Sequence, residues 1–139
     1  MSSSHLQMSS RERYPEDMAR DKASHPPELC SRFHQASELI GRRWTGAIIY
    51  VLMRTRCRFV TLRGAIPDIT DRMLSERLQE LEAQGIVERT VIPDTPVRVE
   101  YALSAKGRAL ASTIDAISAW AERWVALPGP ARSQARRRK

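Results

Sequence analysis

The sequence predicts a mainly α-helical domain that carries one small β-hairpin. Three observations support this fold class: a helix over 70–84 with capping residues at both ends, two strand-like segments over 87–103, and apolar residues at helical spacing before and after them. A chain of 139 residues suits one such domain with short flanking segments.

Two helices are predicted at the start of the domain. The first begins within 28–31, just after a pair of prolines, and ends at Gly41, which is a natural helix stop. The second runs from Trp44 to about Arg54, because its apolar residues recur at helical spacing.

A short strand and a short helix are predicted next. Residues 57–60 form the strand, and Thr61 caps a helix over 62–66 whose apolar side chains hold it inward. Residues 67–69 make the turn into the following helix, and a turn of three or four residues is typical of a helix-turn-helix.

The helix over 70–84 has signals for both of its ends. Thr70 is a good N-cap, because its hydroxyl can accept a hydrogen bond from a first-turn N–H. Gly85 can adopt the left-handed conformation that ends a helix. The buried side is expected to be a narrow stripe of leucines at helical spacing, which are Leu74, Leu78 and Leu81.

The opposite side of this helix is polar. It carries a guanidinium, a hydroxyl, a carboxylate and an amide, and these groups can read base edges in the major groove of DNA. They belong to Arg72, Ser75, Glu76 and Gln79. Taken alone, the stretch is better described as a solvated amphipathic helix. The segment that follows it favours the DNA-reading interpretation.

That segment is a predicted β-hairpin over 87–103. Apolar and polar residues alternate in its second half, which is the pattern of a half-buried strand, and two prolines within 93–96 place a stiff loop at its tip. Three helices closed by such a hairpin form a winged helix-turn-helix. In that fold the second helix of the pair enters the major groove and the wing contacts the DNA backbone or the adjacent groove.

A long helix is predicted from Ser104 to about Val125. Its apolar residues step by four, three, four and three, which matches the spacing of a coiled-coil seam. We expect a second subunit to cover this seam, and docking back onto the same chain is the alternative. The predicted dimerisation residues are Leu110, Ile114, Ile117, Trp120, Ala121 and Trp124.

An ordered set of short motifs extends from about residue 30 to 124. The longest are ELIGRRWT at 38–45, RMLSERL at 72–78, GIVER at 85–89 and PVRVEY at 96–101, with shorter pairs between them. In order and spacing, the set resembles the HxlR-type regulators, a branch of bacterial winged-helix transcription factors close to the MarR type. The resemblance implies a sequence-specific regulator that binds DNA as a homodimer built on its terminal helices.

A two-fold dimer would present two copies of the 70–84 helix to a pseudo-palindromic operator, with half-site centres ~34 Å apart. Two sets of contacts are expected. The base-facing set comprises Arg72, Ser75, Glu76 and Gln79, with Thr70 at the helix start. The set that contacts phosphates or the adjacent groove comprises Arg77, Arg89 and Arg98.

The charge is unevenly distributed along the chain. The formal net charge is +7, and five of these positive charges come from the basic tail over 128–139, which contains no acidic residue. A basic tail favours contact with a polyanion such as DNA. Together with the predicted elements, this charge distribution divides the chain into three parts. They are a disordered arm over 1–27, a winged-helix domain with its dimerisation helices over 28–127, and the basic tail over 128–139.

The two cysteines are predicted to be free. Neither a signal peptide nor an apolar run of eighteen residues is present, so a cytoplasmic protein without a membrane partner is expected, and cytoplasmic thiols stay reduced. Cys30 lies near a helix N-terminus with Arg32 close by, which lowers a thiol pKa. Burial as a small apolar residue is the alternative.

The resemblance also implies a candidate signal. Several regulators of this type sense electrophiles or oxidants through a cysteine just before the first conserved helix, and Cys30 stands near that place. Ser31 follows it where the family pattern has a proline. A non-covalent small-molecule effector, bound between the DNA-binding body and the dimer helices, is the rival interpretation.

Enzyme chemistry is not expected. The sequence has no phosphate-binding glycine loop and no histidine–cysteine cluster with zinc spacing, so we predict no cofactor and no metal. Glu76 and Glu80 are interpreted as surface charges. The alternative to an operator-binding regulator is a winged-helix module that binds protein or RNA without operator specificity.

Overall fold

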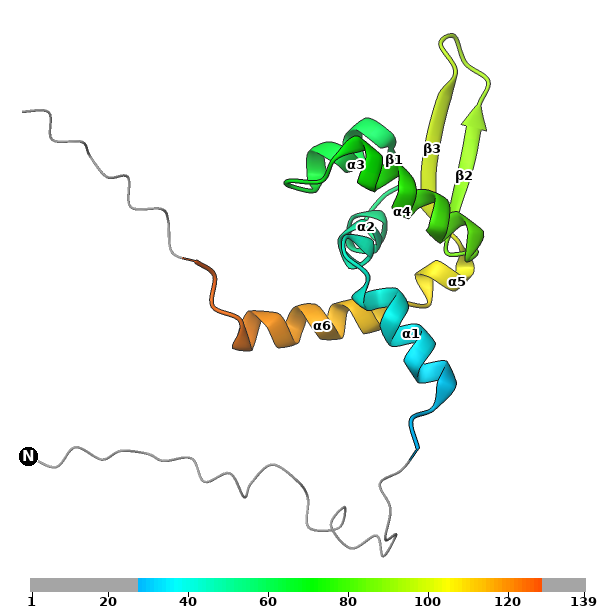
Figure 1. Ribbon diagram of the computed structural model, residues 1–139. Helices are drawn as coiled ribbons and strands as arrows, with labels where there is room; N and C mark the ends of the chain where they lie inside the picture. Colours follow the sequence, from blue (N-terminus) through cyan, green and yellow to red (C-terminus); the bar gives the residue numbers. More distant parts are fainter. Residues whose placement is uncertain (1–27, 129–139) are drawn as a thin grey trace, which may run out of the picture. The chain divides into compact units, whose positions relative to one another are not determined.

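The computed structural model describes residues 28–128 (Figure 1). The predicted arm over 1–27 and the tail beyond Pro128 lie outside the described residues. The chain divides into two compact units, 1–34 and 35–139. In the first, the described part is the start of α1, where the backbone N–H of His34 donates to the carbonyl of Cys30 at 2.9 Å.

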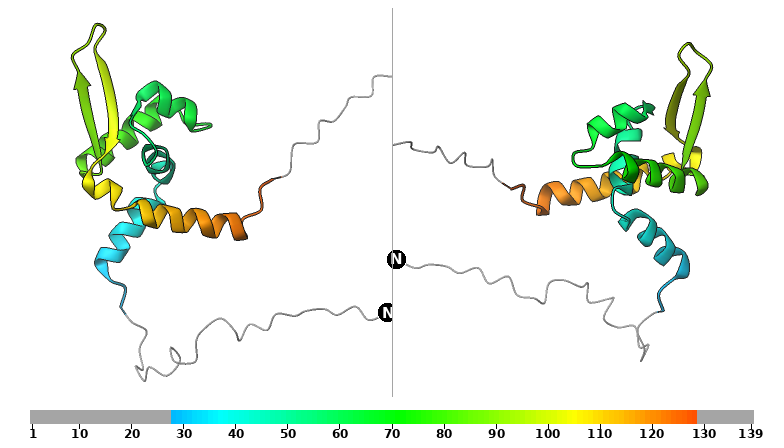
Figure 2. Two further views of the ribbon diagram at one scale, coloured as in Figure 1. Left: turned by 180° about the vertical axis from the view of Figure 1, so that it is seen from behind. Right: turned by 45° about the horizontal axis from the view of Figure 1, so that its top comes forward.

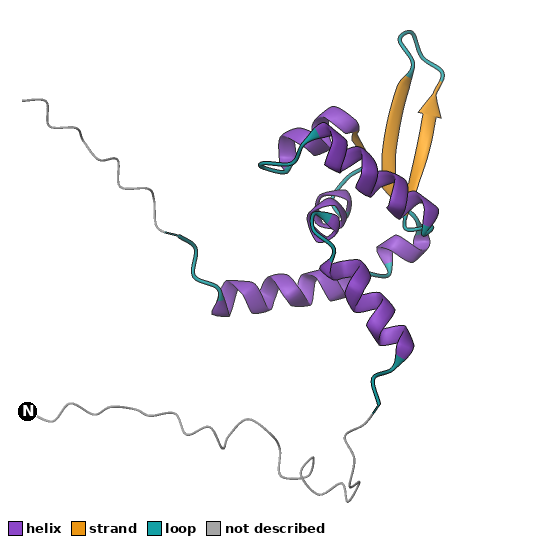
Figure 3. Ribbon diagram, viewed as in Figure 1, coloured by secondary structure: helices purple, strands orange, loops and turns teal. Residues whose placement is uncertain are grey.

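The described elements follow one another as the fold class predicts (Figure 3). They are α1 (Ser31–Gly41), α2 (Thr45–Leu52), β1 (Cys57–Arg58), α3 (Phe59–Ala65), α4 (Asp71–Ala83), β2 (Val87–Ile92), β3 (Arg98–Leu103), α5 (Ala105–Arg108) and α6 (Ala111–Trp124). The predicted winged helix-turn-helix is confirmed, with α3 and α4 as the helix pair.

The sheet is antiparallel, with β3 between β1 and β2. Val87 pairs with Leu103 and Ile92 with Arg98, so β2 and β3 form one continuous hairpin. Cys57 pairs with Tyr101, which attaches the short strand β1 to the base of this hairpin. Its tip projects away from α3 and α4 (Figures 1 and 2).

The core lies between the helices and the base of the hairpin. The leucine stripe of α4 is almost fully buried, with 0% exposure for Leu74, 2% for Leu78 and 1% for Leu81. Burying one such side chain stabilises a fold by roughly 1.5–3 kcal/mol. The stripe belongs to one core cluster with buried side chains from α2, α3, β2 and the bend before β2, including Ile48, Ile49, Leu62, Val87 and Ile86.

Both predicted ends of α4 are confirmed. The backbone N–H of Met73 donates to the Thr70 hydroxyl at 3.2 Å, which makes Thr70 the N-cap. Gly85 has φ +72, and the N–H of Ile86 donates to the carbonyl of Leu81 at 2.9 Å. These contacts form a Schellman motif, so local signals alone determine where α4 begins and ends.

Two helix predictions require correction. The supporting helix begins at Phe59, with Arg58 rather than Thr61 at its N-cap position. The long helix predicted from Ser104 is two helices, because the N–H of Leu110 donates to the carbonyl of Gly107 at 3.1 Å and tightens the chain between α5 and α6. Gly107 lies so close to Ile86 that a Cβ there would be 2.2 Å from its carbonyl oxygen.

Arg77 is also placed differently from its prediction. It is 7% exposed, because it lies beside the leucine stripe and turns under α4. Its Nε donates to the carbonyl of Arg43 at 2.9 Å, and its Nη1 lies 3.2 Å from an oxygen of Glu80. The expectation that Arg77 contacts phosphates is therefore wrong, because its guanidinium serves the fold.

Glu80 joins α4 to the turn between α1 and α2. Its carboxylate accepts two hydrogen bonds from Arg42, both of 2.8 Å, in addition to the contact with Arg77. We call Arg42, Arg77 and Glu80 the Glu80 cluster. Trp44 in this turn has φ 74, a left-handed conformation that costs a residue with a side chain roughly 1–2 kcal/mol. The cluster holds the turn in place against that cost.

The Glu80 cluster predicts a pH-dependent contribution to stability. The hydrogen bonds from Arg42 hold the pKa of Glu80 below its ordinary value of 4.5, with a further contribution from Arg77. A carboxyl whose pKa is lowered by folding stabilises the fold above its unfolded pKa and loses that contribution as the pH falls through the folded value. We expect Glu80→Gln to lower the free energy of unfolding at neutral pH, and the difference from the wild type to vanish at acidic pH below 4.5.

Denaturant unfolding of the wild type and Glu80→Gln, from neutral pH to below pH 4.5, measures this difference in the free energy of unfolding. Glu82→Gln is the matched control, because Glu82 is exposed on the same helix and forms no ion pair within residues 28–128. The same pH dependence in both variants would contradict the assignment of the effect to Glu80.

Candidate nucleic-acid interface

The helix-turn-helix is held together by its turn. Ile66 and Ile69 are 4% and 5% exposed, so both ends of the turn are anchored in the core. Between them Asp68 adopts φ 66, a left-handed conformation that aspartate tolerates better than most residues. The angle between α3 and α4 is thus determined by core packing.

The polar face of α4 lies on the surface. The Arg72 side chain is 86% exposed and that of Glu76 is 45% exposed, while Gln79 is exposed and Ser75 is half-buried. Arg72 Nε and Glu76 Oε1 form an ion pair of 3.1 Å. An exposed pair at this spacing contributes only about 0.3–0.5 kcal/mol, so Arg72 can leave it for another acceptor at little cost.

The hairpin carries two arginines that the sequence singled out. Arg89 is exposed on β2. Arg98 begins β3, and its Nη2 lies 2.9 Å from an oxygen of Asp94 in the hairpin loop. Its Nε is buried and has no hydrogen-bond partner among the described residues. Arg98 is therefore less accessible than Arg89, and its charge is partly neutralised by Asp94.

The apolar seam predicted around α6 separates into two parts. Leu110 packs against the core and Ile114 is 5% exposed, so both belong to the interior of the chain's own fold. Ala121 is half-buried. The remaining apolar side chains are uncovered: Ile117 is 48% exposed, and Trp120 and Trp124 are each 61% exposed. We call Ile117, Trp120 and Trp124 the α6 strip. Docking back onto the described part of the chain does not cover it.

The two cysteines have opposite environments. Cys30 is exposed, and the backbone N–H groups of Phe33 and Arg32 at the start of α1 lower the pKa of its thiol. The Arg32 effect thus comes from its backbone rather than its side-chain charge. Cys57 is buried in the core, and loss of solvation raises the pKa of its thiol. Burial of Cys30 as a small apolar residue is excluded by its exposure.

Sequence reasoning missed the Glu80 cluster. Glu80 was interpreted as surface charge, because its main partner Arg42 lies 38 residues away along the chain. No local pattern connects the two residues. Within residues 28–128, no group of three or more metal-ligating side chains gathers, and no helix is both long and apolar enough to cross a bilayer.

Comparison with known proteins places the chain in a family. Residues 39–128 match the HxlR-like helix-turn-helix family. The HTH-type transcriptional regulator YvaP of Bacillus subtilis is 46% identical over 98 residues, which cover 70% of this chain and 91% of that protein. The regulator YodB of Bacillus subtilis is 46% identical over 96 residues, which cover 69% and 86%.

Solved structures agree with these relatives. The reduced form of YodB superimposes with a TM-score of 0.64 at 45% identity, covering 70% of this chain and 96% of that one. The oxidised form of the redox regulator HypR superimposes with a TM-score of 0.66 at 35% identity, covering 69% and 99%. The protein described here therefore belongs to the HxlR-like helix-turn-helix family and is a transcriptional regulator of the HxlR/MarR type.

Proposed function

We propose that the protein binds a pseudo-palindromic DNA operator as a homodimer and changes its operator affinity in response to a thiol-reactive signal. The observation that carries this proposal is the polar face of α4, which is exposed while the opposite face is buried. A protein that regulates transcription in this way acts in the cytoplasm, on DNA, and needs no catalytic group or cofactor.

The dimensions and chemistry of α4 suit the major groove. A helix with its side chains is about 10–12 Å across, and the groove is about 12 Å wide. Arg72 offers a guanidinium that can bind guanine at two points, and Gln79 offers an amide that can do the same with adenine. Ser75 and Glu76 lie between them, and Thr70 is at the helix start, although its hydroxyl is already engaged as the N-cap.

The hairpin supplies the contacts that do not depend on sequence. Arg89 is the stronger candidate for a phosphate contact, since it is exposed and forms no ion pair within the described residues. Arg98 must exchange Asp94 for a phosphate before it can contribute. Phosphate contacts position the protein on DNA, whereas base contacts determine which sequence it prefers.

The α6 strip supports a homodimer. Two tryptophans and an isoleucine, each about half exposed or more, gather on one helix. A tryptophan can bury 150–250 Å², roughly, so this surface is costly to leave in water. A second copy of α6 offers the same apolar groups. A two-fold axis through this contact would present both α4 helices to half-sites ~34 Å apart.

Cys30 supports the proposed signal. Its thiol is exposed and its pKa is lowered, so a larger fraction is thiolate at neutral pH, and the thiolate is the form that attacks electrophiles. YodB has been solved in quinone-bound and diamide-treated forms, and HypR is a redox regulator solved in oxidised and reduced forms. A non-covalent effector is the competing possibility for this chain.

The operator proposal is tested by selecting duplexes from a random pool with purified protein and measuring binding to the recovered duplex and to random DNA. We expect Arg72→Ala to relax specificity at one base pair of each half-site, at a cost of about 1–3 kcal/mol. Arg89→Ala is the contrasting variant, and should weaken specific and random DNA alike and lower the salt slope by about one. Equal losses on both DNAs for Arg72→Ala would refute its base-reading role. Recovery of no preferred duplex would refute operator binding itself.

The dimer proposal is tested by sedimentation. We expect the wild type to sediment at twice the chain mass of 15.8 kDa and Trp120→Glu to sediment as a monomer, because a buried carboxylate without a partner is strongly unfavourable. Ala119→Glu is the matched control, since Ala119 is exposed on the opposite side of α6. A Trp120→Glu protein that remains dimeric would exclude the α6 strip as the contact.

The signal proposal is tested with benzoquinone and the selected duplex. We expect quinone treatment to release the wild type and Cys57→Ala from DNA but to leave Cys30→Ser bound. Iodoacetamide should alkylate Cys30 much faster than Cys57 at neutral pH, since only Cys30 is exposed and has a lowered pKa. If Cys30→Ser is released as readily as the wild type, Cys30 is not the sensor.

A further inference from the structure

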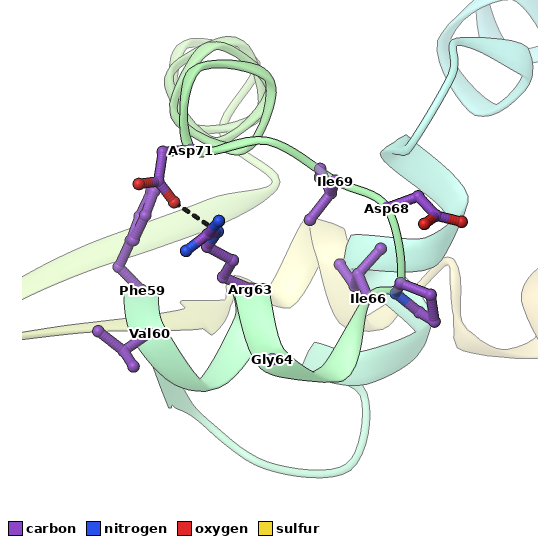
Figure 4. A pocket seen from close by; sticks show the side chains of 9 residues that line it. Phe59, Val60, Arg63, Gly64, Ile66, Asp68, Ile69 and Asp71 are labelled. Atoms are coloured by element: carbon purple, nitrogen blue, oxygen red, sulfur yellow. Dashed lines mark ion pairs between the residues drawn. The ribbon is translucent and has the colours of Figure 1, made fainter.

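A hollow lies between α3 and the start of α4, and none of the assignments above uses it (Figure 4). It has a volume of about 590 Å³ and opens to solvent. Phe59, Val60 and Arg63 of α3 line it on one side, and Asp71, the first residue of α4, lines it on the other. The hollow therefore adjoins the end of the helix that we propose enters the major groove.

Val60 is the unusual side chain of this hollow. It is 79% exposed, and within residues 57–86 no other large apolar side chain is exposed. In Figure 4 it extends outward from the first turn of α3, at the end of the hollow away from Ile66 and Ile69. Core packing does not explain a valine in this place, because its methyl groups contact little of the protein.

The polar wall of the hollow is electrically balanced. Arg63 Nε lies 2.7 Å from an oxygen of Asp71, and both side chains are more than half exposed. An unpaired carboxylate at the start of α4 would be repelled by DNA phosphates, and Arg63 neutralises it. The Nη groups of Arg63 have no partner within residues 28–128, so they remain available as donors. This wall is thus compatible with close approach of a polyanion.

The DNA group that would fill this hollow can be inferred from the chemistry of base edges. Arg72, the proposed base-reading residue, follows Asp71 directly in the chain, so the hollow adjoins the base pair that Arg72 would contact. Val60 has no donor or acceptor for a phosphate or an amide. In the major groove the 5-methyl of thymine is the group that an apolar side chain can contact, and such contacts distinguish thymine from the other bases.

We propose that Val60 is a specificity-determining residue that contacts the 5-methyl of a thymine beside the base pair read by Arg72. The hollow between Val60 and the Arg63–Asp71 pair receives the edge of that thymine. This inference rests on the proposed operator binding, and adds a base contact from α3 to those of α4.

Substitution of deoxyuridine for thymine tests the contact at a single methyl group. In the duplex recovered by selection, each thymine is replaced in turn by deoxyuridine, and affinity is measured for the wild type and for Val60→Ala. We expect one position per half-site at which the replacement weakens the wild type about three- to fivefold, the loss that corresponds to one buried methyl group. The same replacement should change the affinity of Val60→Ala less than about twofold.

Two control variants make the result specific. Val60→Ile keeps the branched apolar side chain and should retain the deoxyuridine effect at the same position. Val91→Ala removes an exposed valine from the hairpin and should leave that effect unchanged. Because Val60 is exposed, Val60→Ala should unfold at the wild-type temperature, which separates a lost contact from a lost fold.

The outcomes distinguish this inference from the proposed function. If selection yields a preferred duplex but deoxyuridine weakens the wild type and Val60→Ala equally at every position, the thymine contact is wrong and operator binding stands. If selection yields no preferred duplex, operator binding fails and the thymine contact fails with it.

Discussion

The burial of the leucine side of α4 is the constraint on which the rest of the structure depends. Leu74, Leu78 and Leu81 are almost completely removed from water, and together they determine which way the helix faces. Rotation of α4 about its axis would expose these leucines at a cost of several kcal/mol, roughly. The free energy gained by burying the leucines therefore holds the polar side of α4 at the surface. The polar face of α4 is held in place because the opposite face of the same helix forms part of the core.

The Glu80 cluster adds a polar constraint on the same helix. Arg77 reaches beneath α4 to a backbone carbonyl, and Glu80 reaches outward to Arg42. The turn between α1 and α2 and the middle of α4 are thus tied by hydrogen bonds in which at least one partner is charged. Any displacement of this turn would be resisted at α4 itself, because both hydrogen-bond partners in the turn are held by side chains of α4.

The last two helices, α5 and α6, differ in how their apolar side chains are packed. Gly107 of α5 lies against the backbone of Ile86, just before β2, and Ile114 of α6 is buried in the core of the same chain. Beyond that point the large apolar side chains of α6 are about half exposed or more, and the described chain does not cover them. The division between buried and exposed apolar side chains falls within α6, between Ile114 and Ile117.

The sequence by itself determined the elements whose signals are local. These are the Thr70 cap, the Gly85 stop, the leucine stripe and the alternating hairpin. Each depends on interactions between residues a few positions apart, so each can be predicted from the order of residues alone. It also carried the motifs that indicated the family. Only the tertiary structure decided the burial of Arg77, the partners of Glu80 and the exposure of Val60. These depend on how the helices pack, and Arg42, the main partner of Glu80, is 38 residues away along the chain. Periodicity identifies the side of a helix that is apolar, but the packed neighbours determine which of its polar groups remain free.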